Sequence, residues 1–396
     1  MPLKPNRSLR GKAAIVGLGE TAYYKHGRSP YGEFELALQA ILAACKDAGL
    51  DPHEIDGFSG YSDERSDSTR LASALGIHRM RTSLMQWGGG GGGCCAAVAN
   101  AAAAVSAGMA DCVVAFRSLA QGQFGRFGAA GSDSTISGEK SYLMPYGILA
   151  PPTRFAMRIR RFMHEHKLEQ KALRAVAMAS YHHAQANPRA LMNGKPLTEN
   201  QYDESRWIVE PLHLFDCCME NDGAAAVIVV SEERAKKFKQ KPAYIMGAAT
   251  GASHRFGAMA HNSPNYGSAD FETLAPDLFN MADLSPSDVG SVQCYENFTG
   301  GVVMALAEHG FFKPEEANNY LRLENLIAPN GVLPLNTSGG NLAECYVHGF
   351  ELIVEATRQI RGTSTSQAKR NDVALVIGGP MVSPTSNLLL GSEEVL

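Results

Sequence analysis

The sequence predicts an α/β protein made of two similar halves, each with a buried sheet covered by helices. Short apolar runs typical of buried strands stand near the start of each half, at Ala13–Gly17 and Ala243–Gly247. A proline-containing turn also recurs, as Leu50–Asp56 and Leu284–Val289. In both turns the proline stands where a capping residue and an acidic first turn would start a short helix.

The segments around these turns follow the same order in both halves. Each first strand is followed by an irregular stretch and then by an amphipathic helix, expected over 33–48 and over 270–282. Each proline turn leads into a strand that ends near a tyrosine, Tyr61 or Tyr295. Strands that alternate with helices through short connections predict buried sheets with helices on their faces.

Each half then continues with a glycine-rich loop, a helix and a strand. The expected segments are loop 88–93, helix 94–107 and strand 112–116 in the first half, and loop 338–340, helix 341–361 and strand 373–377 in the second. Two such units in tandem fit two similar sheets packed around shared central helices.

An insertion interrupts the first half, with amphipathic helices expected over 154–166 and 169–186. A buried strand then returns at 222–230. Long insertions on a regular scaffold are usually functional or form an interface. The predicted divisions are the first half in two parts, 1–120 and 210–240, the insertion 121–209, and the second half 241–396.

Composition excludes several classes of protein. The chain has 396 residues, 45% of them hydrophobic, which is enough for one large core or two fused ones. The net charge is −4 with acids and bases interspersed, so no nucleic-acid partner is expected. No apolar run approaches the ~18 residues of a membrane span. Residues 1–7 lack the apolar core of a signal peptide, and we expect a cytoplasmic protein.

The eight cysteines show no metal-binding or redox spacing. They stand at positions 45, 94, 95, 112, 217, 218, 294 and 345, and none forms a Cys-x-x-Cys pair. Several lie inside apolar runs, which predicts buried free thiols in a reducing compartment. His164 and His166 would lie on different faces of a helix, so no metal site is expected.

Six consecutive glycines, Gly88–Gly93, precede an alanine-rich helix. Backbone without side chains can bring its N–H groups close to a ligand, and a helix N-terminus favours an oxyanion. The alternatives are a flexible linker or close packing of two helix ends. The run is not a P-loop, because no Gly-Lys-Ser/Thr follows it.

Two later stretches resemble active-site motifs of the thiolase superfamily, in its lipid-transfer-protein branch. Cys294–Thr299 matches the His-Asp-Cys-Phe or Asn-Glu-Ala-Phe block, and Asn336–Gly340 matches Asn-Pro-Ser-Gly-Gly followed by Gly-His-Pro. The resemblance covers nearly the whole chain and implies the thiolase fold, in which duplicated halves form five αβαβα layers. Counted along these motifs, Tyr295 replaces the histidine or asparagine and Tyr346 replaces the catalytic histidine.

The same resemblance implies that both thiolase cysteines are absent. In that family the nucleophile begins the central helix about twenty residues before an Ala-Asp/Glu pair, and counting back from Ala110 and Asp111 reaches Gly91. Val376 occupies the position of the second cysteine. Acyl transfer needs one cysteine to carry the acyl group and another acid–base group to move a proton. The fold is therefore expected without that chemistry.

Two alternatives remain open at this level. If the register of the comparison shifts, Cys94 or Cys95 becomes a nucleophile at a helix N-terminus, and the chain would be a thiolase or acyl-CoA acyltransferase. The tyrosines could instead be core residues of a non-catalytic acyl-CoA or lipid-binding partner of another enzyme.

The tyrosines resemble those of the steroid side-chain-cleaving aldolases, a subgroup that acts on β-hydroxyacyl-CoA thioesters. Such a retro-aldol cleavage needs a base for the β-hydroxyl proton, stabilisation of the enolate, and an acid for the released carbon. Tyr295 and Tyr346 would be the catalytic pair, with Tyr346 the better candidate for the base because it replaces a histidine and lies near His348.

Further residues are expected in support of this pair. The supporting side chains would be His348, Glu296 and Asn297, and backbone donors to the enolate oxygen would be Gly91, Gly92 and Gly379. Arg154, Arg158, Arg160 and Arg161 either contact CoA phosphates or form a solvated helix face.

The resemblance also implies an assembly. We expect a homodimer formed through a sheet edge, with the apolar strand 112–116 as the candidate. A separate small OB-fold and zinc-ribbon protein of the acyl-CoA-associated type is the expected second partner. No cofactor is expected, because CoA is part of the substrate.

Overall fold

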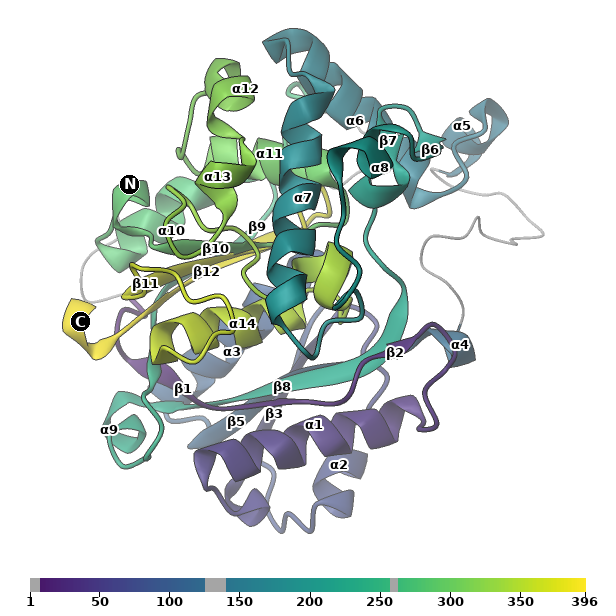
Figure 1. Ribbon diagram of the computed structural model, residues 1–396. Coiled ribbons are helices and arrows are strands. Elements are labelled where there is room, and N and C mark those ends of the chain that lie inside the picture. The colour runs from purple at the N-terminus through teal and green to yellow at the C-terminus, as the bar shows by residue number, and fades with distance from the viewer. Residues whose placement is uncertain (1–7, 125–139, 257–262) are drawn as a thin grey trace.

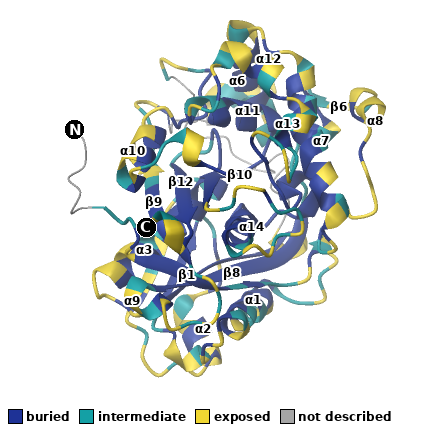
Figure 2. Ribbon diagram, turned by 60° about the vertical axis from the view of Figure 1, so that its left-hand side comes forward, coloured by how far each residue is buried: buried dark blue, intermediate teal, exposed yellow. Residues whose placement is uncertain are grey.

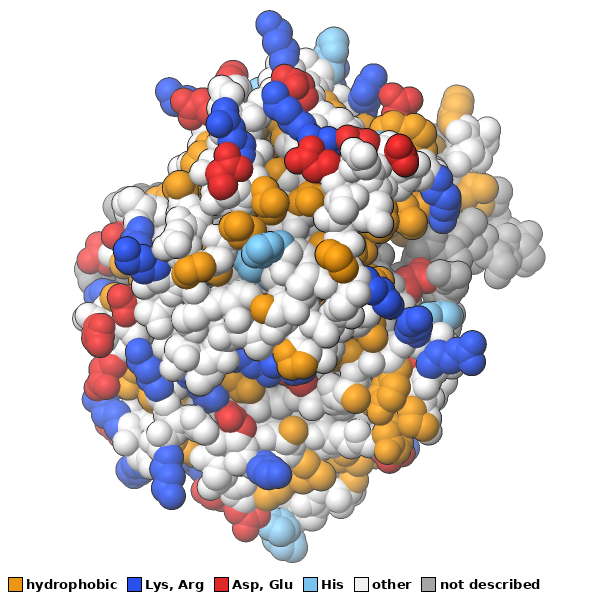
Figure 3. Space-filling view, viewed as in Figure 1, with side chains coloured by type: hydrophobic (Ala, Val, Ile, Leu, Met, Phe, Trp, Pro, Cys, Tyr) orange, Lys and Arg blue, Asp and Glu red, His pale blue; other side chains and the backbone are white. Residues whose placement is uncertain are grey.

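The computed structural model of the protein describes residues 8–124, 140–256 and 263–396. Two expectations fall partly outside these residues: the absence of a signal peptide, which concerns 1–7, and the insertion, which includes 125–139. In the described part, no helix is long and apolar enough to cross a membrane. Acidic and basic side chains are interspersed over the face in Figure 3.

Ten strands form one mixed sheet, in the order β10-β11-β12-β9-β1-β8-β5-β3-β4, with β2 beside β8. Their bounds are β1 Ala13–Glu20, β2 Tyr24–Lys25, β3 Gly57–Tyr61, β4 Thr82–Gln86, β5 Cys112–Ala120, β8 Asn221–Ser231, β9 Ala243–Gly251, β10 Ser291–Cys294, β11 Val373–Gly378 and β12 Thr385–Gly391. A separate hairpin pairs β6, Trp207–Val209, with β7, Leu212–His213.

The strand order confirms the duplication. In the first half β3 is parallel to β5, and β5, β8 and β1 follow with antiparallel pairing. The second half repeats this with β10, β11, β12 and β9. The halves join where Ala14 and Ile15 of β1 pair with Tyr244 and Ala243 of β9. In the first half the edge strand β4 is parallel to β3. In the second half Leu335 takes the equivalent place, because it forms a parallel bridge with Val292 of β10.

The helices complete five αβαβα layers, which run from bottom to top in Figure 1. Helix α1 covers the first half and α10 covers the second, whereas α3 and α14 pack between the halves. Figure 2 shows these central helices and the strands as the buried part of the molecule. The α-helices are α1 Glu33–Ala48, α2 Ser68–Ala74, α3 Cys94–Ser106, α4 Gln121–Phe124, α5 Lys140–Leu143, α6 Pro151–His166, α7 Gln170–Ala186, α8 Glu199–Asp203, α9 Glu232–Ala235, α10 Leu274–Ala282, α11 Thr299–Glu308, α12 Ala317–Tyr320, α13 Leu323–Leu326 and α14 Phe350–Arg361.

Local sequence explains several of these boundaries. Helix α1 starts with two acidic residues, Glu33 and Glu35, in its first turn, which complement the helix dipole. It ends at Gly49, whose φ of 70° is the left-handed conformation of a helix C-cap. Both proline turns form the expected short 3₁₀ helices, Pro52–Glu54 and Pro286–Asp288.

Two predicted helices were too long. The segment 341–361 is one helix in the prediction, but the structure has a π-helical turn over Gly340–Glu344 and then no helix until Phe350. His348 and Gly349 interrupt it with φ values of 57° and 90°, which an α-helix does not contain. Similarly α10 begins only at Leu274, because Asp270 has a φ of 76°.

The strand proposed for dimerisation was wrong. Strand β5, which contains the segment 112–116, lies inside the sheet between β8 and β3 and is buried along its whole length. Both of its edges are already paired, so it cannot pair with a second chain. The strand at the edge of this half is β4.

Candidate active site

A cavity of about 740 Å³ lies between the insertion and the loops that follow the strands of the second half. The insertion supplies much of its apolar wall, including Phe155, Tyr181 and Ile208, and the segment that follows it adds Leu214 and Phe215. The opposite side contains Gly90, Gly91, Tyr295, Tyr346 and His348. The insertion therefore forms a large apolar space over the predicted catalytic residues.

The two predicted tyrosines meet in this cavity. Their hydroxyl oxygens are 2.7 Å apart and hydrogen-bonded, and their ring centroids are 5.9 Å apart. The backbone of Tyr295 continues from β10 and donates to the carbonyl of Ile377. Tyr346 lies in the segment between the π-helical turn and α14, where its backbone N–H donates to Asn221. Motifs 51 residues apart thus form one pair of phenols.

Burial controls the acidity of this pair. It raises the pKa of both phenols well above 10, and the neighbouring Tyr346 raises that of Tyr295 further. For Tyr346 the hydrogen bond with Tyr295 partly offsets the effect of burial, but the pKa of Tyr346 still lies well above 10. Neither phenol is therefore ionised at neutral pH, and a proton accepted by one can pass to the other through their shared hydrogen bond.

Gly91 makes room for this arrangement. A Cβ atom added to Gly91 would lie 2.3 Å from Cε2 and 2.6 Å from the hydroxyl oxygen of Tyr295. Those separations are far inside van der Waals contact. The phenol therefore fills the space that any side chain at position 91 would need.

The cysteine alternative is not supported by the placement of the thiols. Cys94 and Cys95 are fully buried in the first turn of α3, outside the cavity lining. Burial raises the pKa of Cys94 well above 9, which disfavours the nucleophilic thiolate. Cys217 and Cys218 do line the cavity, but burial raises the pKa of Cys218 to about 12.

We expect the two buried cysteines to be dispensable for turnover. Cys94→Ala and Cys95→Ala remove small apolar groups from the core and no group from the cavity, so kcat should stay within about threefold of wild type. Peptide mapping after brief iodoacetamide treatment should find no rapid stoichiometric modification at either position. Rapid labelling of Cys94 or Cys95 with loss of turnover would instead identify a thiolase-type nucleophile.

The glycines expected as backbone donors lie in different places. Gly91 lines the cavity. The N–H of Gly92 instead donates to the carbonyl of Gly89 over 2.5 Å. Gly379 packs behind the cavity, where an added Cβ would lie 2.2 Å from the Gly92 nitrogen. The N–H of Gly92 is therefore already bonded within its own loop, and Gly379 lies outside the cavity lining.

The supporting side chains also divide between the cavity and its surroundings. Asn297 lines the cavity, and its amide donates to the carbonyl of Pro380 over 3.1 Å. Glu296 is fully buried and accepts a 2.5 Å hydrogen bond from Ser180 of α7. Burial raises the pKa of Glu296 to about 7. Glu296 thus connects the insertion to the Tyr295 motif and does not face the cavity.

His348 lines the cavity beside the tyrosines, with ring centroids 5.6 Å from Tyr346 and 6.4 Å from Tyr295. Burial, together with the positive charge of Arg117, lowers its pKa to about 3. The imidazole is therefore neutral at physiological pH and is no proton reservoir for the pair.

Sequence reasoning missed the charged residues behind His348. Arg117 is fully buried in β5 and contacts Asp63, Glu64 and His348. The available signal was an arginine at the end of the apolar run 112–116, because a charge in a buried strand requires a partner. The partners of Arg117 could not be predicted, because Asp63 and Glu64 lie more than 50 residues away in the chain.

The four arginines of α6 have separate roles. Arg154 lines the cavity. Arg158 is buried and donates to the backbone carbonyls of neighbouring loops, whereas Arg160 and Arg161 form exposed ion pairs with Glu210 and Glu165. Among the described residues, no group of three His, Cys, Asp or Glu side chains could hold a metal ion.

The duplicated scaffold and the cavity together define a class: a thiolase-fold protein whose cavity holds two phenols and whose expected cysteine positions are Gly91 and Val376. Residues 250–392 match the family described as thiolase C-terminal domain-like. The chain is 39% identical, over 98% of its length, to the steroid side-chain-cleaving aldolase of Thermomonospora curvata, of which it covers 99%. It is 38% identical, over 97% of its length, to the 17-hydroxy-3-oxo-4-pregnene-20-carboxyl-CoA lyase of Mycobacterium tuberculosis, of which it covers 100%.

A solved structure, the Ltp2-ChsH2(DUF35) aldolase, is similar throughout, with a TM-score of 0.90 and 37% identity over 97% of this chain and 99% of that chain. The chain therefore belongs to the thiolase superfamily and, within it, to the family of the steroid side-chain-cleaving aldolases.

Proposed function

We propose that the protein is an acyl-CoA aldolase that cleaves a steroid β-hydroxyacyl-CoA between its α and β carbons. The observation that carries this proposal is the pair of phenols, 2.7 Å apart, that fills the space beside Gly91. Such a site holds two groups that can exchange protons with the substrate. It has no nucleophile at the position that thiolases use. Both curated relatives are named for cleavage of this kind.

The proposed reaction needs only groups that the cavity supplies. One phenol oxygen accepts the proton of the β-hydroxyl while its own proton passes along the 2.7 Å hydrogen bond to the other phenol, and the β carbon becomes a carbonyl as the Cα–Cβ bond breaks. The electron pair of that bond passes into the thioester as an enolate. The other phenol donates a proton to Cα, which gives a short acyl-CoA and a steroid ketone or aldehyde. Because the proton is relayed from one phenol to the other, both are neutral again when Cα has been protonated.

The cavity favours a large apolar substrate with an anionic tail. Its wall of aromatic and aliphatic side chains suits a fused-ring hydrocarbon, whose burial contributes most of the binding energy. Arg154 and Arg206 also line the cavity and are the proposed contacts for CoA phosphates.

The test is direct product identification. Purified protein should convert a steroid β-hydroxyacyl-CoA into equal amounts of ketone or aldehyde and short acyl-CoA, without any added cofactor. A product that carries the acyl group on a second CoA molecule would indicate thiolysis and contradict the proposal.

We also propose a homodimer formed through the edge strand β4, together with a small OB-fold and zinc-ribbon partner. The edge of β4 leaves backbone groups available for pairing with a second chain. Met85 of β4 and the following Trp87 are 52% and 84% exposed, which is unusual for large apolar side chains. The similar solved structure is named for two components, of which ChsH2(DUF35) is the second.

Light scattering should give twice the mass of one chain, and Met85→Arg combined with Trp87→Asp should shift the protein towards monomer. Leu42→Arg is the matched control, because Leu42 is 46% exposed on α1, a helix that packs on β1, β8 and β5. A dimer that survives the β4 double variant, or a fully active wild-type monomer, would contradict this assembly.

A further inference from the structure

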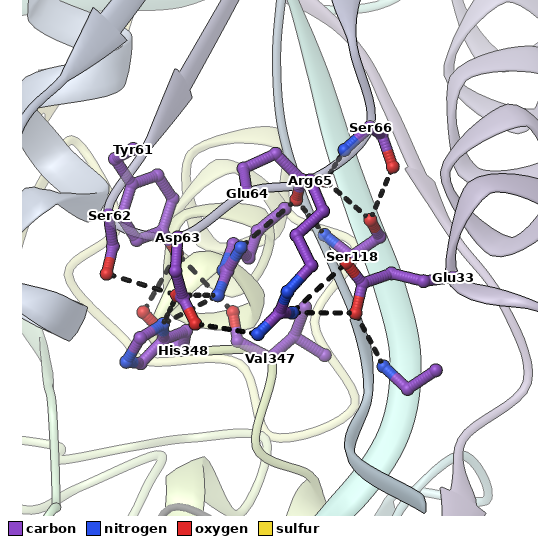
Figure 4. A network of polar contacts seen from close by, with 12 residues as sticks. Glu33, Tyr61, Ser62, Asp63, Glu64, Arg65, Ser66, Ser118, Val347 and His348 are labelled. Atoms are coloured by element: carbon purple, nitrogen blue, oxygen red, sulfur yellow. Dashed lines mark hydrogen bonds and ion pairs between the residues drawn. The ribbon is translucent and has the colours of Figure 1, made fainter. Parts of the chain in front are cut away.

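His348 connects the cavity to a buried network of charged residues, drawn in Figure 4. Its ring faces the tyrosines on one side, and its Nδ1 atom is 3.2 Å from a guanidinium nitrogen of Arg117 on the other. The carbonyl of His348 accepts a 2.8 Å hydrogen bond from the hydroxyl of Tyr61. Backbone and side chain are thus both held from the first half of the fold.

Arg117 is itself fixed. It is fully buried, and Asp63 and Glu64 hold its two terminal nitrogens at 2.5 and 3.3 Å. Glu64 is in turn held by the backbone N–H and the hydroxyl of Ser118. The guanidinium therefore has one orientation, and its contact with His348 belongs to a rigid network.

This contact determines which imidazole nitrogen carries the proton. A guanidinium can only donate hydrogen bonds, so Nδ1 must be the acceptor and cannot carry a hydrogen. Asp63 is 4.0 Å from Nδ1, which is too far to bind a hydrogen there. A neutral imidazole without hydrogen on Nδ1 carries it on Nε2.

The Nε2 atom lies at the cavity. A Cβ atom added to Gly90, a residue of the cavity lining, would be 3.5 Å from Nε2 of His348. The nitrogen that carries the hydrogen is therefore next to the glycine loop and near both phenols. Neither Gly92, whose N–H is bonded within its loop, nor Gly379 is part of the cavity lining, so Nε2 of His348 is a donor better placed than either.

We propose that His348 donates from Nε2–H to the thioester oxygen as the enolate forms, and that Arg117 is the positioning residue that fixes this tautomer. The inference rests on the proposed function and adds a hydrogen-bond donor to it. As the Cα–Cβ bond breaks, negative charge develops on the thioester oxygen, and a fixed donor stabilises that charge more than the neutral substrate. His348 keeps its proton throughout, and the two phenols carry out the proton transfers.

The tautomer can be measured without substrate. In protein labelled with ¹⁵N-histidine, long-range ¹H–¹⁵N correlation spectra distinguish Nε2–H from Nδ1–H imidazoles. The chain has 12 histidines, so the His348 signal is assigned by its absence from His348→Gln. We expect the Nε2–H pattern at neutral pH. An Nδ1–H pattern or a charged imidazole would overturn the inference.

Two substitutions of similar size separate hydrogen bonding from packing. His348→Leu removes the donor and should lower kcat by about 10²–10³-fold, the usual effect of losing one oxyanion donor, with KM within about threefold. His348→Gln can accept from Arg117 through its oxygen and donate through its nitrogen, so its kcat should stay within about tenfold of wild type. Circular dichroism and thermal melting would confirm that both variants fold.

The outcomes distinguish this inference from the function on which it rests. Equal kcat values for wild type and His348→Leu would overturn the role of His348 while leaving the aldolase proposal intact. A wild-type protein that binds the substrate but does not cleave it would overturn both. Arg117 is better tested by the tautomer than by substitution, because its removal would leave Glu64 buried without a partner charge.

Discussion

Tyr295→Phe and Tyr346→Phe should each lower kcat by about 10²–10⁴-fold, the usual effect of losing a general acid or base. Each substitution removes one hydroxyl from a buried hydrogen-bonded pair and leaves the ring packing in place. The remaining phenol loses its hydrogen-bond partner, which costs roughly 1–3 kcal/mol of stability and should leave the fold intact. Binding of CoA esters should persist, because neither hydroxyl is needed to fill the apolar cavity.

The measurement is steady-state cleavage of a substrate that the wild-type protein is shown to turn over. Tyr181→Phe is the matched control, because Tyr181 also lines the cavity but lies outside the hydrogen-bonded pair. It should retain near-normal turnover. If both Tyr295→Phe and Tyr346→Phe were as active as this control, the two-tyrosine mechanism would be wrong.

The same variants assign the acid and the base. The phenol that protonates Cα should also catalyse exchange of the α-hydrogen of the short acyl-CoA product with deuterium from solvent. Loss of its hydroxyl should abolish the exchange, whereas loss of the base should mainly affect cleavage. Mass spectrometry of the product after incubation in deuterium oxide therefore distinguishes Tyr295 from Tyr346.

Gly91→Ala should be nearly as damaging as loss of a catalytic tyrosine. The new Cβ would be 2.3 Å from the ring of Tyr295, so the ring must move out of its hydrogen bond with Tyr346. Overpacking of this kind typically costs about 1–3 kcal/mol of stability. Gly91→Cys should be similarly inactive in cleavage and should not gain acyl-transfer activity, because the second thiolase cysteine position is occupied by Val376.

Melting temperature and kcat should be measured together for these variants. Gly32→Ala is the control, since an added Cβ at Gly32 meets no atom closer than 3.9 Å. A double-mutant cycle sharpens the test: Gly91→Ala should cost much less stability when Tyr295 is also alanine. Additive effects of the two substitutions would show that Gly91 and Tyr295 do not share the space described.

The parts of the fold that depend on local pattern were predictable. Helix α1 has the predicted bounds, since an amphipathic repeat, acidic residues at its start and Gly49 at its end all indicate the same segment. The segment 341–361 failed because its composition permits a continuous helix, whereas its interruption depends on His348 and Gly349 in conformations set by tertiary contacts. The error matters, because Tyr346 lies in that interruption.

The site was predictable only as far as it resembles a family motif. Tyr295 and Tyr346 were identified from motif positions, and the structure brings their hydroxyls together. Arg117 was missed because its strand was expected to end at Phe116, and its partners are non-local. The dimer strand was chosen for its apolar sequence, but burial inside a sheet produces the same composition as burial in an interface.

The contact between Gly91 and Tyr295 also constrains how such a site can arise from a thiolase ancestor. A cysteine at position 91 and a tyrosine at position 295 cannot occupy the fold together, because the Cβ of the first overlaps the ring of the second. The residues at the two positions are therefore coupled, since a side chain at 91 and the present placement of the Tyr295 ring exclude each other. A route from a thiolase-type site in which glycine is acquired at 91 before tyrosine at 295 avoids this overlap.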